Sequence, residues 1–368
     1  MIIDKVIPHH IRIPFDAGPA SFARAGKGTT ALDMVLVEVV TDTGLTGWGD
    51  AFAYACSDAV VAAIRQMIVS RVVGLAVPPR DELQGFSDRL QKQLHLFGRY
   101  GITMFAISGL DIALWDLAAK VAGKTLSDLI GPRRRAAIPA YASLLSIGKP
   151  DAVASECKKA VAKSYRAIKI HETTVEAVAA ARDAIGPDVP LMVDMNCPMS
   201  AAEAIAFATS CRPYAPLFLE EPVWPPEDYK AQARVQMNGR VAVAAGENAC
   251  TAWQFNEMIS QRAVTWVQPS ITKVGGVTEF GRVAALADRA NVRLMPHSPY
   301  FGPGLLATLQ MLSLRDDASL VEWYYMDRAA CLWGDALALG ADGAIRVPTG
   351  PGLGLEPDRE VMARYAVP

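Results

Sequence analysis

The sequence predicts an α/β protein in which an α+β domain is followed by a (β/α)8 barrel. The first third of the chain has strand patterns followed by helical patterns, whereas strands and helices alternate from residue 131 onward. In this second part, eight strand ends recur at intervals of about 25 residues, close to the ~30 residues per unit expected of such a barrel. An open parallel sheet is the less favoured alternative.

The N-terminal region, residues 1–55, has the character of a sheet. Strands are expected over Ile2–Ile7, Val35–Thr41 and Thr46–Gly49. The last two are separated by a short turn that contains Gly44, which predicts a hairpin. We therefore expect strands, two of them paired in a hairpin, at the start of the chain.

A loop and a helical region complete the first domain. The segment Phe15–Thr30 contains three glycines and the cations Arg24 and Lys27, so we expect a mobile loop. From about residue 58 to residue 130 the pattern is helical, and Ile107–Ala122 is expected to form an amphipathic helix. The first domain is thus predicted over residues 1–130.

The barrel is predicted over residues 131–343. Gly131–Pro132 marks its start, because this pair favours a turn. The tail, residues 344–368, has strand and turn character and is expected to pack back on the first domain. The eight strands are expected to end near Tyr141, Lys169, Asp194, Glu220, Glu247, Ser270, His297 and Glu322.

Composition excludes several classes of protein. The 368 residues are 51% hydrophobic and 20% charged, which is typical of a globular protein with a large core. The net charge of −2 gives no electrostatic basis for binding nucleic acid or an anionic membrane. No apolar run approaches the ~20 residues that span a bilayer, and the N-terminus lacks the pattern of a signal peptide. The six scattered cysteines are typical of free thiols, so cytoplasm is the expected location.

Three acidic residues, Asp194, Glu220 and Glu247, end successive predicted strands. The carboxyl ends of barrel strands meet at one mouth, and carboxylate oxygens are the ligands that Mg²⁺ prefers. A single acid at a strand end is often only a helix cap or half of an ion pair. Three acids in step favour a magnesium site, which could stabilise negative charge on a substrate oxygen.

Basic residues at the same mouth predict proton transfer. Lys169 and His171 point to one face of their strand, and His297 lies in a loop rich in proline and glycine. Together with a metal, such groups suit removal of a weakly acidic proton α to a carboxylate. The alternatives are that either histidine only packs in the core, and that Arg24 and Lys27 are solvated loop charges.

The chain resembles the enolase superfamily and, within it, the mandelate racemase subgroup. The resemblance implies a modified (β/α)8 barrel of the TIM type with an α+β capping domain, and one Mg²⁺ on the three acids named above. It also implies that loops at Phe15–Thr30 and Asp50–Ser57 close over the substrate. The segments that carry it are Ile107–Asp116, Ala167–His171, Val193–Asn196, Leu219–Pro222, Gly246–Asn248, Lys273–Val277 and Gly350–Gly354.

The resemblance also implies roles for single residues. Lys169 matches a lysine that neutralises the substrate carboxylate, and His297 matches the acid/base of the seventh strand. Glu221 is expected to lie beside the metal ligands rather than among them. Further substrate contacts are expected from Ser143, Asn196, Ser270, Glu322, Arg24 and Tyr54, and specificity also from Tyr300 and Phe301.

Two departures from the family pattern matter. The second strand carries Lys-x-His where Lys-x-Lys is usual, and an imidazole can act as a base near neutral pH. The sixth strand carries Ser270 where an aspartate partner for the histidine, or a lysine base, is usual. Lys273 does not fill that position. His297 is therefore expected to lack the group that fixes its tautomer, which favours an acid role over a base role.

These features predict an enzyme, and the first hypothesis is a Mg²⁺-dependent dehydratase of a sugar acid or a related 2-hydroxy carboxylate. His171 removes the α-proton and His297 protonates the departing hydroxyl. A racemase, epimerase or cycloisomerase with the same enediolate intermediate is the alternative, and an inactive binding homologue is the third. A homo-oligomer with a small-molecule substrate is expected.

Overall fold

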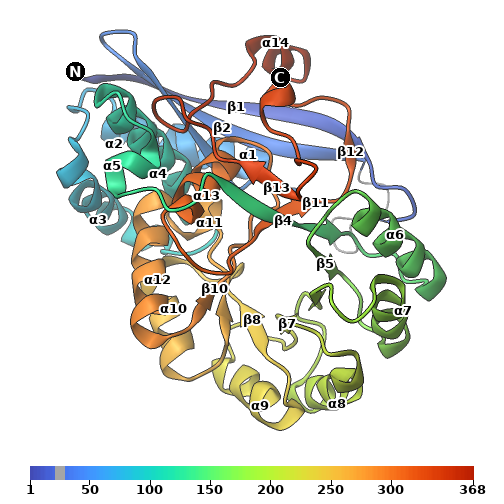
Figure 1. Ribbon diagram of the computed structural model, residues 1–368. Coiled ribbons are helices and arrows are strands. Elements are labelled where there is room, and N and C mark those ends of the chain that lie inside the picture. The colour runs from blue at the N-terminus through green and yellow to red at the C-terminus, as the bar shows by residue number, and fades with distance from the viewer. Residues whose placement is uncertain (21–29) are drawn as a thin grey trace.

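The computed structural model describes residues 1–20 and 30–368. Its N-terminal sheet is antiparallel and formed by β1 (Ile3–Asp16), β2 (Ala31–Thr41) and β3 (Thr46–Ala51), with β12 (Asp327–Arg328) added beside β1. The sheet lies above the barrel in Figure 1. The three strands were predicted, but β1 and β2 are longer than expected, so that the predicted loop at residues 15–30 begins inside β1.

Helices follow the sheet along the chain, and several of them, α4 (Ile102–Val121) foremost, pack against it. They are α1 (Ser57–Ala63), the π-helix η1 (Ile64–Ile68), α2 (Val69–Val72), η2 (Arg80–Glu82), α3 (Leu83–Gln93), η3 (His95–Phe97), α4 (Ile102–Val121) and α5 (Leu126–Ile130).

The central helix α4 is buried on nearly every side, so the prediction of an amphipathic helix was wrong. It lies between β3 and the barrel helices, which leaves little of its surface for water. Close approach to β3 requires glycine: a Cβ on Gly49 would lie 1.8 Å from the main-chain oxygen of Gly109. By length and composition α4 could cross a membrane, but 94% of its most apolar stretch is buried inside the protein, as in a core helix.

The barrel contains the eight predicted parallel strands, and each is hydrogen-bonded to its neighbours in the order β10-β9-β8-β7-β6-β5-β4-β11. The fold is therefore a modified TIM barrel with a capping domain. The strands are β4 (Ala137–Leu144), β5 (Ala167–Ile170), β6 (Leu191–Asp194), β7 (Phe218–Glu220), β8 (Val243–Ala245), β9 (Trp266–Val267), β10 (Arg293–Leu294) and β11 (Val321–Tyr324).

Helices surround the barrel in Figure 1. They are α6 (Pro150–Ala162), α7 (Val175–Ile185), α8 (Ala201–Cys211), η4 (Arg212–Tyr214), α9 (Tyr229–Gly239), α10 (Thr251–Ser260), α11 (Ile271–Val274), α12 (Gly276–Ala290) and α13 (Pro303–Ser313). The chain ends with η5 (Gly334–Ala336), β13 (Ala344–Arg346) and α14 (Arg359–Arg364).

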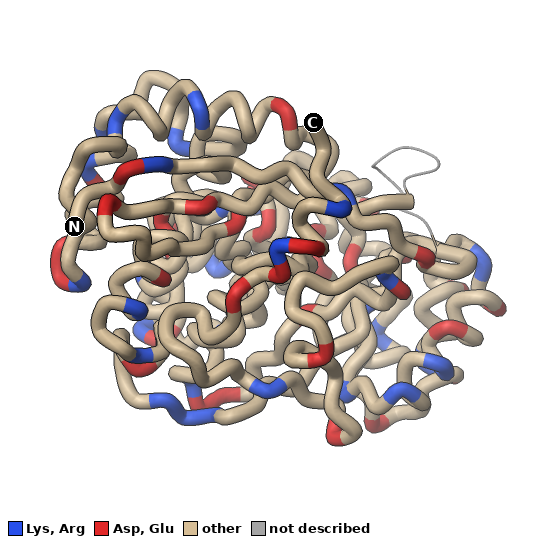
Figure 2. Tube along the Cα trace, turned by 90° about the horizontal axis from the view of Figure 1, so that it is seen from above, with Lys and Arg blue, Asp and Glu red and all other residues tan. Residues whose placement is uncertain are grey.

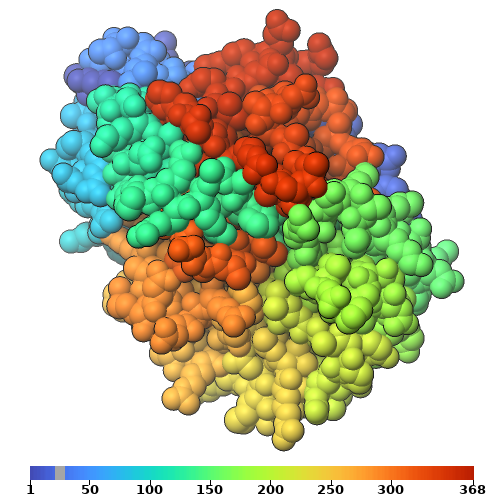
Figure 3. Space-filling model, viewed as in Figure 1, coloured from blue at the N-terminus to red at the C-terminus, as the bar shows by residue number. Residues whose placement is uncertain are grey.

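A layer of apolar side chains fills the barrel interior below the mouth, and on the face in Figure 3 packed side chains close the barrel. Successive strand residues point to opposite faces, so residues two apart share a face. Two positions after each of several layer residues comes a polar residue of the predicted site. The layer consists of Tyr141, Ala167, Met192, Phe218, Ala244, Trp266 and Met295.

The C-terminal segment contacts both the barrel and the capping sheet. Strand β13 pairs with β4, and the main chain of Tyr365 accepts a hydrogen bond from Arg12. The Arg359 guanidinium lies 2.6 Å from a Glu38 oxygen and stacks over Trp48. Charged residues of both signs are interspersed along the chain (Figure 2). All six cysteines are free thiols.

Candidate active site

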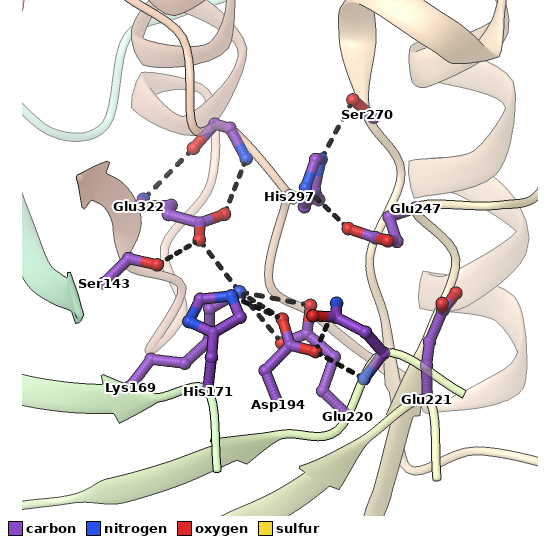
Figure 4. A network of polar contacts seen from close by, with 12 residues as sticks. Ser143, Lys169, His171, Asp194, Glu220, Glu221, Glu247, Ser270, His297 and Glu322 are labelled. Atoms are coloured by element: carbon purple, nitrogen blue, oxygen red, sulfur yellow. Dashed lines mark hydrogen bonds and ion pairs between the residues drawn. The ribbon is translucent and has the colours of Figure 1, made fainter. Parts of the chain in front are cut away.

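The predicted site residues meet at the carboxyl ends of the barrel strands (Figure 4). Arg24 and Lys27 lie outside the described residues. Tyr54, from the capping domain, lies close enough to Glu247 and Glu322 for their charges to act on it. Glu247, Ser270 and His297 form one group of polar contacts. A second and larger network joins Ser143, Lys169, His171, Asp194, Asn196, Glu220 and Glu322.

The Lys169 ammonium lies at the centre of this network and is fully buried. Its Nζ is 2.8 Å from Glu322 Oε1, 3.1 Å from Asp194 Oδ2 and 3.2 Å from both oxygens of Glu220. Burial acts to lower the pKa of Lys169, but the surrounding acids, Glu220 foremost, raise it well above the ordinary value. The side chain therefore carries its charge and is suited to hold an anion rather than to accept a proton.

His171 is held by one nitrogen and exposes the other to the site. Its Nδ1 lies 2.5 Å from the main-chain oxygen of Leu144, and its Nε2 lies 3.1 Å from Asp194 Oδ2. A carbonyl only accepts hydrogen bonds, so Nδ1 carries a proton and Nε2 faces the acids. Burial acts to lower the pKa of His171, but Asp194 raises it overall. This geometry suits a base that acts through Nε2.

The three predicted metal ligands are paired with basic side chains of the site. Asp194 and Glu220 contact Lys169, while Glu247 Oε2 lies 2.7 Å from His297 Nε2. Among residues 1–20 and 30–368, no three acidic, histidine or cysteine side chains are gathered tightly enough to hold a metal.

The charges of these acids diverge. Burial raises the pKa of Asp194, but Lys169 and His171 hold it far below its ordinary value. Burial and then Asp194 raise the pKa of Glu220 well above its ordinary value. For Glu247, His297 outweighs burial and lowers the pKa to about 2.

The donor set nevertheless fits a hard divalent cation. It consists of carboxylate oxygens from three neighbouring strand ends, the ligand chemistry of Mg²⁺. Asp194 Oδ2 is buried, and neither of its contacts with Lys169 and His171 has hydrogen-bond geometry, so this oxygen has no hydrogen-bond donor. A buried carboxylate oxygen without a hydrogen-bond donor is costly unless positive charge offsets it, and a divalent cation would add to the charge of Lys169 beside it.

Ser270 occupies the partner position of His297 that the sequence analysis treated as lost. Its Oγ lies 3.2 Å from His297 Nδ1 and 2.6 Å from the hydroxyl of Tyr300. The expectation that His297 lacks a group on this side was therefore wrong. Spacing alone missed this contact, because Ser270 and His297 lie 27 residues apart in the chain.

Glu322 and Asn196 orient the other residues of the site. Glu322 accepts hydrogen bonds from Ser143 Oγ at 2.7 Å and from the main-chain nitrogen of Ser298 at 3.0 Å. Asn196 donates from its main chain and its amide to Asp194 Oδ1, at 3.1 and 2.8 Å. Contacts of Ser143, Asn196 and Glu322 with substrate stay predictions.

Glu221 lies on the other side of its strand end. It accepts hydrogen bonds from Cys197 and from the Asn248 amide, at 3.2 and 2.5 Å. Burial, and then Glu247, raise its pKa to about 7. Its partners differ from those of Glu220, in keeping with a place beside the ligands.

A pair of tyrosines adjoins the site. The Tyr54 and Tyr324 hydroxyls are 3.4 Å apart, and Tyr54 stacks on Phe52 with ring centroids 5.7 Å apart. Tyr324 is not among the predicted site residues, so its place beside the site was missed. Alternation could have found it, because Tyr324 follows Glu322 by two positions on β11.

Two family models match the chain. The enolase C-terminal domain-like model matches residues 152–361, and the mandelate racemase and muconate lactonizing enzyme N-terminal domain model matches residues 11–131. D-galactarolactone cycloisomerase of Agrobacterium fabrum is 30% identical over 99% of this chain and 97% of its own length.

D-gluconate dehydratase of Thermoproteus tenax is 29% identical over 90% of this chain and 69% of its own length. The crystal structure of a racemase from Streptomyces coelicolor A3(2) with bound magnesium superimposes with a TM-score of 0.85, at 26% identity, and covers all of both chains. Magnesium is thus bound by a protein of this fold.

Proposed function

Because this chain belongs to the mandelate racemase and muconate lactonizing enzyme family of the enolase superfamily, we propose that it is a Mg²⁺-dependent dehydratase of a sugar acid. The enzyme removes the proton α to the substrate carboxylate and then eliminates water from the adjacent carbon. The observation that carries this proposal is His171, whose Nδ1–H is bound to Leu144 while Nε2 faces Asp194.

Asp194, Glu220 and Glu247 would hold the metal. A bound Mg²⁺ stabilises the negative charge that develops on the substrate carboxylate as the α-proton leaves. Lys169 adds a second positive charge from the chain itself, and burial strengthens its attraction for an anion because water does not screen it. Glu322 holds Lys169 in place at 2.8 Å.

His171 and His297 divide the proton transfers. His171 Nε2 accepts the α-proton, since its other nitrogen is already committed to Leu144. His297 donates a proton from Nε2 to the departing hydroxyl, and the removal of water is then balanced. The two histidines come from the second and seventh strands of the barrel, so they approach the substrate from different sides.

Cycloisomerisation is the second candidate, and the similarity to a cycloisomerase over nearly the whole chain favours it. If the β-oxygen belongs to a ring, the same elimination opens the ring and the oxygen stays attached, so the product is an isomer. Racemisation or epimerisation would require both histidines to exchange protons with the same carbon. An inactive homologue would bind acids without turnover.

The test is a screen of sugar acids and their lactones with Mg²⁺ in D₂O, followed by NMR and by an assay for 2-keto acids. A keto product with loss of water supports the dehydratase, an isomeric keto product supports the cycloisomerase, and inversion at the α-carbon supports an epimerase. No metal-dependent turnover and no α-exchange with any compound would contradict the proposal.

Variants separate the two histidines. His171→Ala should abolish both α-deuterium exchange and product. His297→Asn should retain exchange into recovered substrate but lose elimination, because only the leaving group then lacks its acid. His95→Asn, an exposed histidine of the capping domain, is the matched control. A His171→Ala enzyme with full turnover would exclude this base.

We also propose that the protein works in the cytoplasm as a homo-oligomer with a small-molecule acid as its substrate. Six free cysteines support a reducing compartment. Light scattering coupled to gel filtration measures the oligomeric state directly.

A further inference from the structure

The Tyr300 hydroxyl forms an unusual junction beside His297. It lies 2.5 Å from the main-chain oxygen of His297 and 2.6 Å from Ser270 Oγ. Ser270 Oγ in turn lies 3.2 Å from His297 Nδ1. Tyr300 and Ser270 are both buried, so these contacts are shielded from water. The three residues form a closed ring of hydrogen bonds that begins and ends on the same histidine.

The direction of every hydrogen bond in this ring follows from one contact. A main-chain carbonyl only accepts, so the single proton of the Tyr300 hydroxyl points to His297 O. Tyr300 therefore accepts from Ser270, and the only proton of the Ser270 hydroxyl is used in that bond. Ser270 can then only accept from the imidazole, so Nδ1 of His297 must carry a hydrogen.

We propose that Tyr300 and Ser270 are positioning residues that hold His297 in the Nδ1–H tautomer, with the lone pair or the transferable proton on Nε2. Nε2 is the nitrogen that faces the site, 2.7 Å from Glu247 Oε2. Because a carboxylate only accepts, Nε2 also carries a hydrogen while it contacts Glu247, and it presents a lone pair when Glu247 is engaged by the metal instead. Two neutral hydroxyls thus perform the orienting role for which a carboxylate is the common solution. The tautomer follows from the geometry alone, whereas its effect on turnover rests on the proposed function.

The contact with the carbonyl is essential to this inference. If Tyr300 donated to Ser270 instead, the serine proton would be free to point at Nδ1, and the imidazole would carry its hydrogen on Nε2. The loop of Tyr300 leads into α13, at whose start Gly304 donates its main-chain hydrogen to Asp50 of the capping domain at 3.1 Å. The loop that this contact ties to the capping domain carries the hydroxyl that donates to His297 O.

The test is the tautomer of His297 in the Mg²⁺-loaded full chain, measured without substrate. Long-range proton–nitrogen NMR of ¹⁵N-histidine-labelled protein distinguishes the two nitrogens, at a pH where the ring is neutral. The chain has five histidines, so His297→Asn identifies the relevant signals. The unmodified protein should show a protonated Nδ1 and an unprotonated Nε2.

Tyr300→Phe should release the Ser270 proton and move the two nitrogen signals of His297 toward each other, as the two tautomers mix. Because a wrong tautomer removes the proton-transfer group, kcat should fall roughly tenfold or more with little change in KM. Ser270→Ala should mix the tautomers as well, whereas Ser270→Thr keeps the hydroxyl and should retain the Nδ1–H form. Tyr325→Phe, whose ring lies against Tyr165 outside the site, is the matched control.

Retention of the Nδ1–H form in both Tyr300→Phe and Ser270→Ala would overturn the inference, even if the enzyme were active. Because the NMR readout needs no substrate, failure to find a sugar-acid activity would leave its result intact. Conversely, an active dehydratase whose unmodified His297 carries its hydrogen on Nε2 would overturn the positioning role and leave the proposed function standing.

Discussion

The buried carboxyl of Asp50 should make the stability of this protein fall as pH rises toward neutrality. Asp50 lies at the end of β3, is 3% exposed, and accepts a hydrogen bond from the main chain of Gly304 at the start of α13. Burial raises its pKa from the ordinary value of 3.8 to about 7, and the Gly304 hydrogen bond opposes this only in part. Within residues 1–20 and 30–368, no basic side chain forms an ion pair with this carboxylate.

The sign follows from proton binding. The pKa is higher in the folded than in the unfolded state, so between about pH 4 and pH 7 the folded protein binds more protons. The free energy of unfolding therefore decreases as pH rises through this window and levels off above it. One pKa unit is worth about 1.4 kcal/mol, so a rise from 3.8 to about 7 corresponds to a loss of about 4 kcal/mol.

Asp50→Asn tests this, because an amide keeps an acceptor oxygen for Gly304 but does not titrate. Relative to the unmodified protein, the variant should gain about 1.4 kcal/mol of stability per pH unit between about pH 5 and pH 7. Urea unfolding midpoints at several pH values measure the difference, and Asp58→Asn, an exposed residue of α1, is the control. A stability difference that is independent of pH across this range would refute the reasoning.

Three other perturbations have definite expected outcomes. Burial acts to raise the pKa of Glu38, but His9 and Arg359 outweigh it and lower the pKa from 4.5 to about 2. The ionised Glu38 therefore stabilises the folded protein above pH 4.5, and this contribution is lost as pH falls toward 2. Glu38→Gln should remove roughly 1–2 kcal/mol of that stability near neutral pH. Hydrogen exchange in α14 should then be faster than in the unmodified protein, and equal exchange rates would contradict this expectation. Gly49→Ala should destabilise by roughly 3 kcal/mol or more in thermal unfolding because its Cβ would collide with Gly109, whereas Gly85→Ala in α3 should be neutral or stabilising. Lys169→Met leaves buried acids unpaired, so the free energy of unfolding of the metal-free protein should fall by roughly 3–5 kcal/mol. Added Mg²⁺ should then raise the Tm of the variant more than that of the unmodified chain. An equal rise in both would argue against a site shared by Lys169 and the metal.

The barrel and the strand-end residues could be predicted because their physical signals are local. Period-two alternation and regular spacing place Lys169 and Asp194 at the same mouth, and the structure brings both there. Burial on both sides of α4 could not be predicted in this way, because it depends on the sheet and the barrel meeting across the helix. Likewise, Lys169 pairs with Glu220 and Glu322, which lie 51 and 153 residues further along the chain.

The case of Ser270 shows why a comparison of strand positions was insufficient. The sixth strand carries no charged partner for His297 in the sequence, because Ser270 stands where an aspartate or lysine is usual. In the structure the partner of His297 is the neutral hydroxyl of Ser270. The orientation of this hydroxyl depends on Tyr300, three residues beyond the histidine, and on the main-chain carbonyl of His297. A main-chain group is the same for every residue type, so nothing in the sequence indicates this contact. A charged partner would both orient and electrostatically favour the imidazolium, whereas two hydroxyls only orient it. If His297 acts as an acid, it must give up its proton. A carboxylate beside it would oppose this step by stabilising the imidazolium, whereas the neutral Ser270 does not.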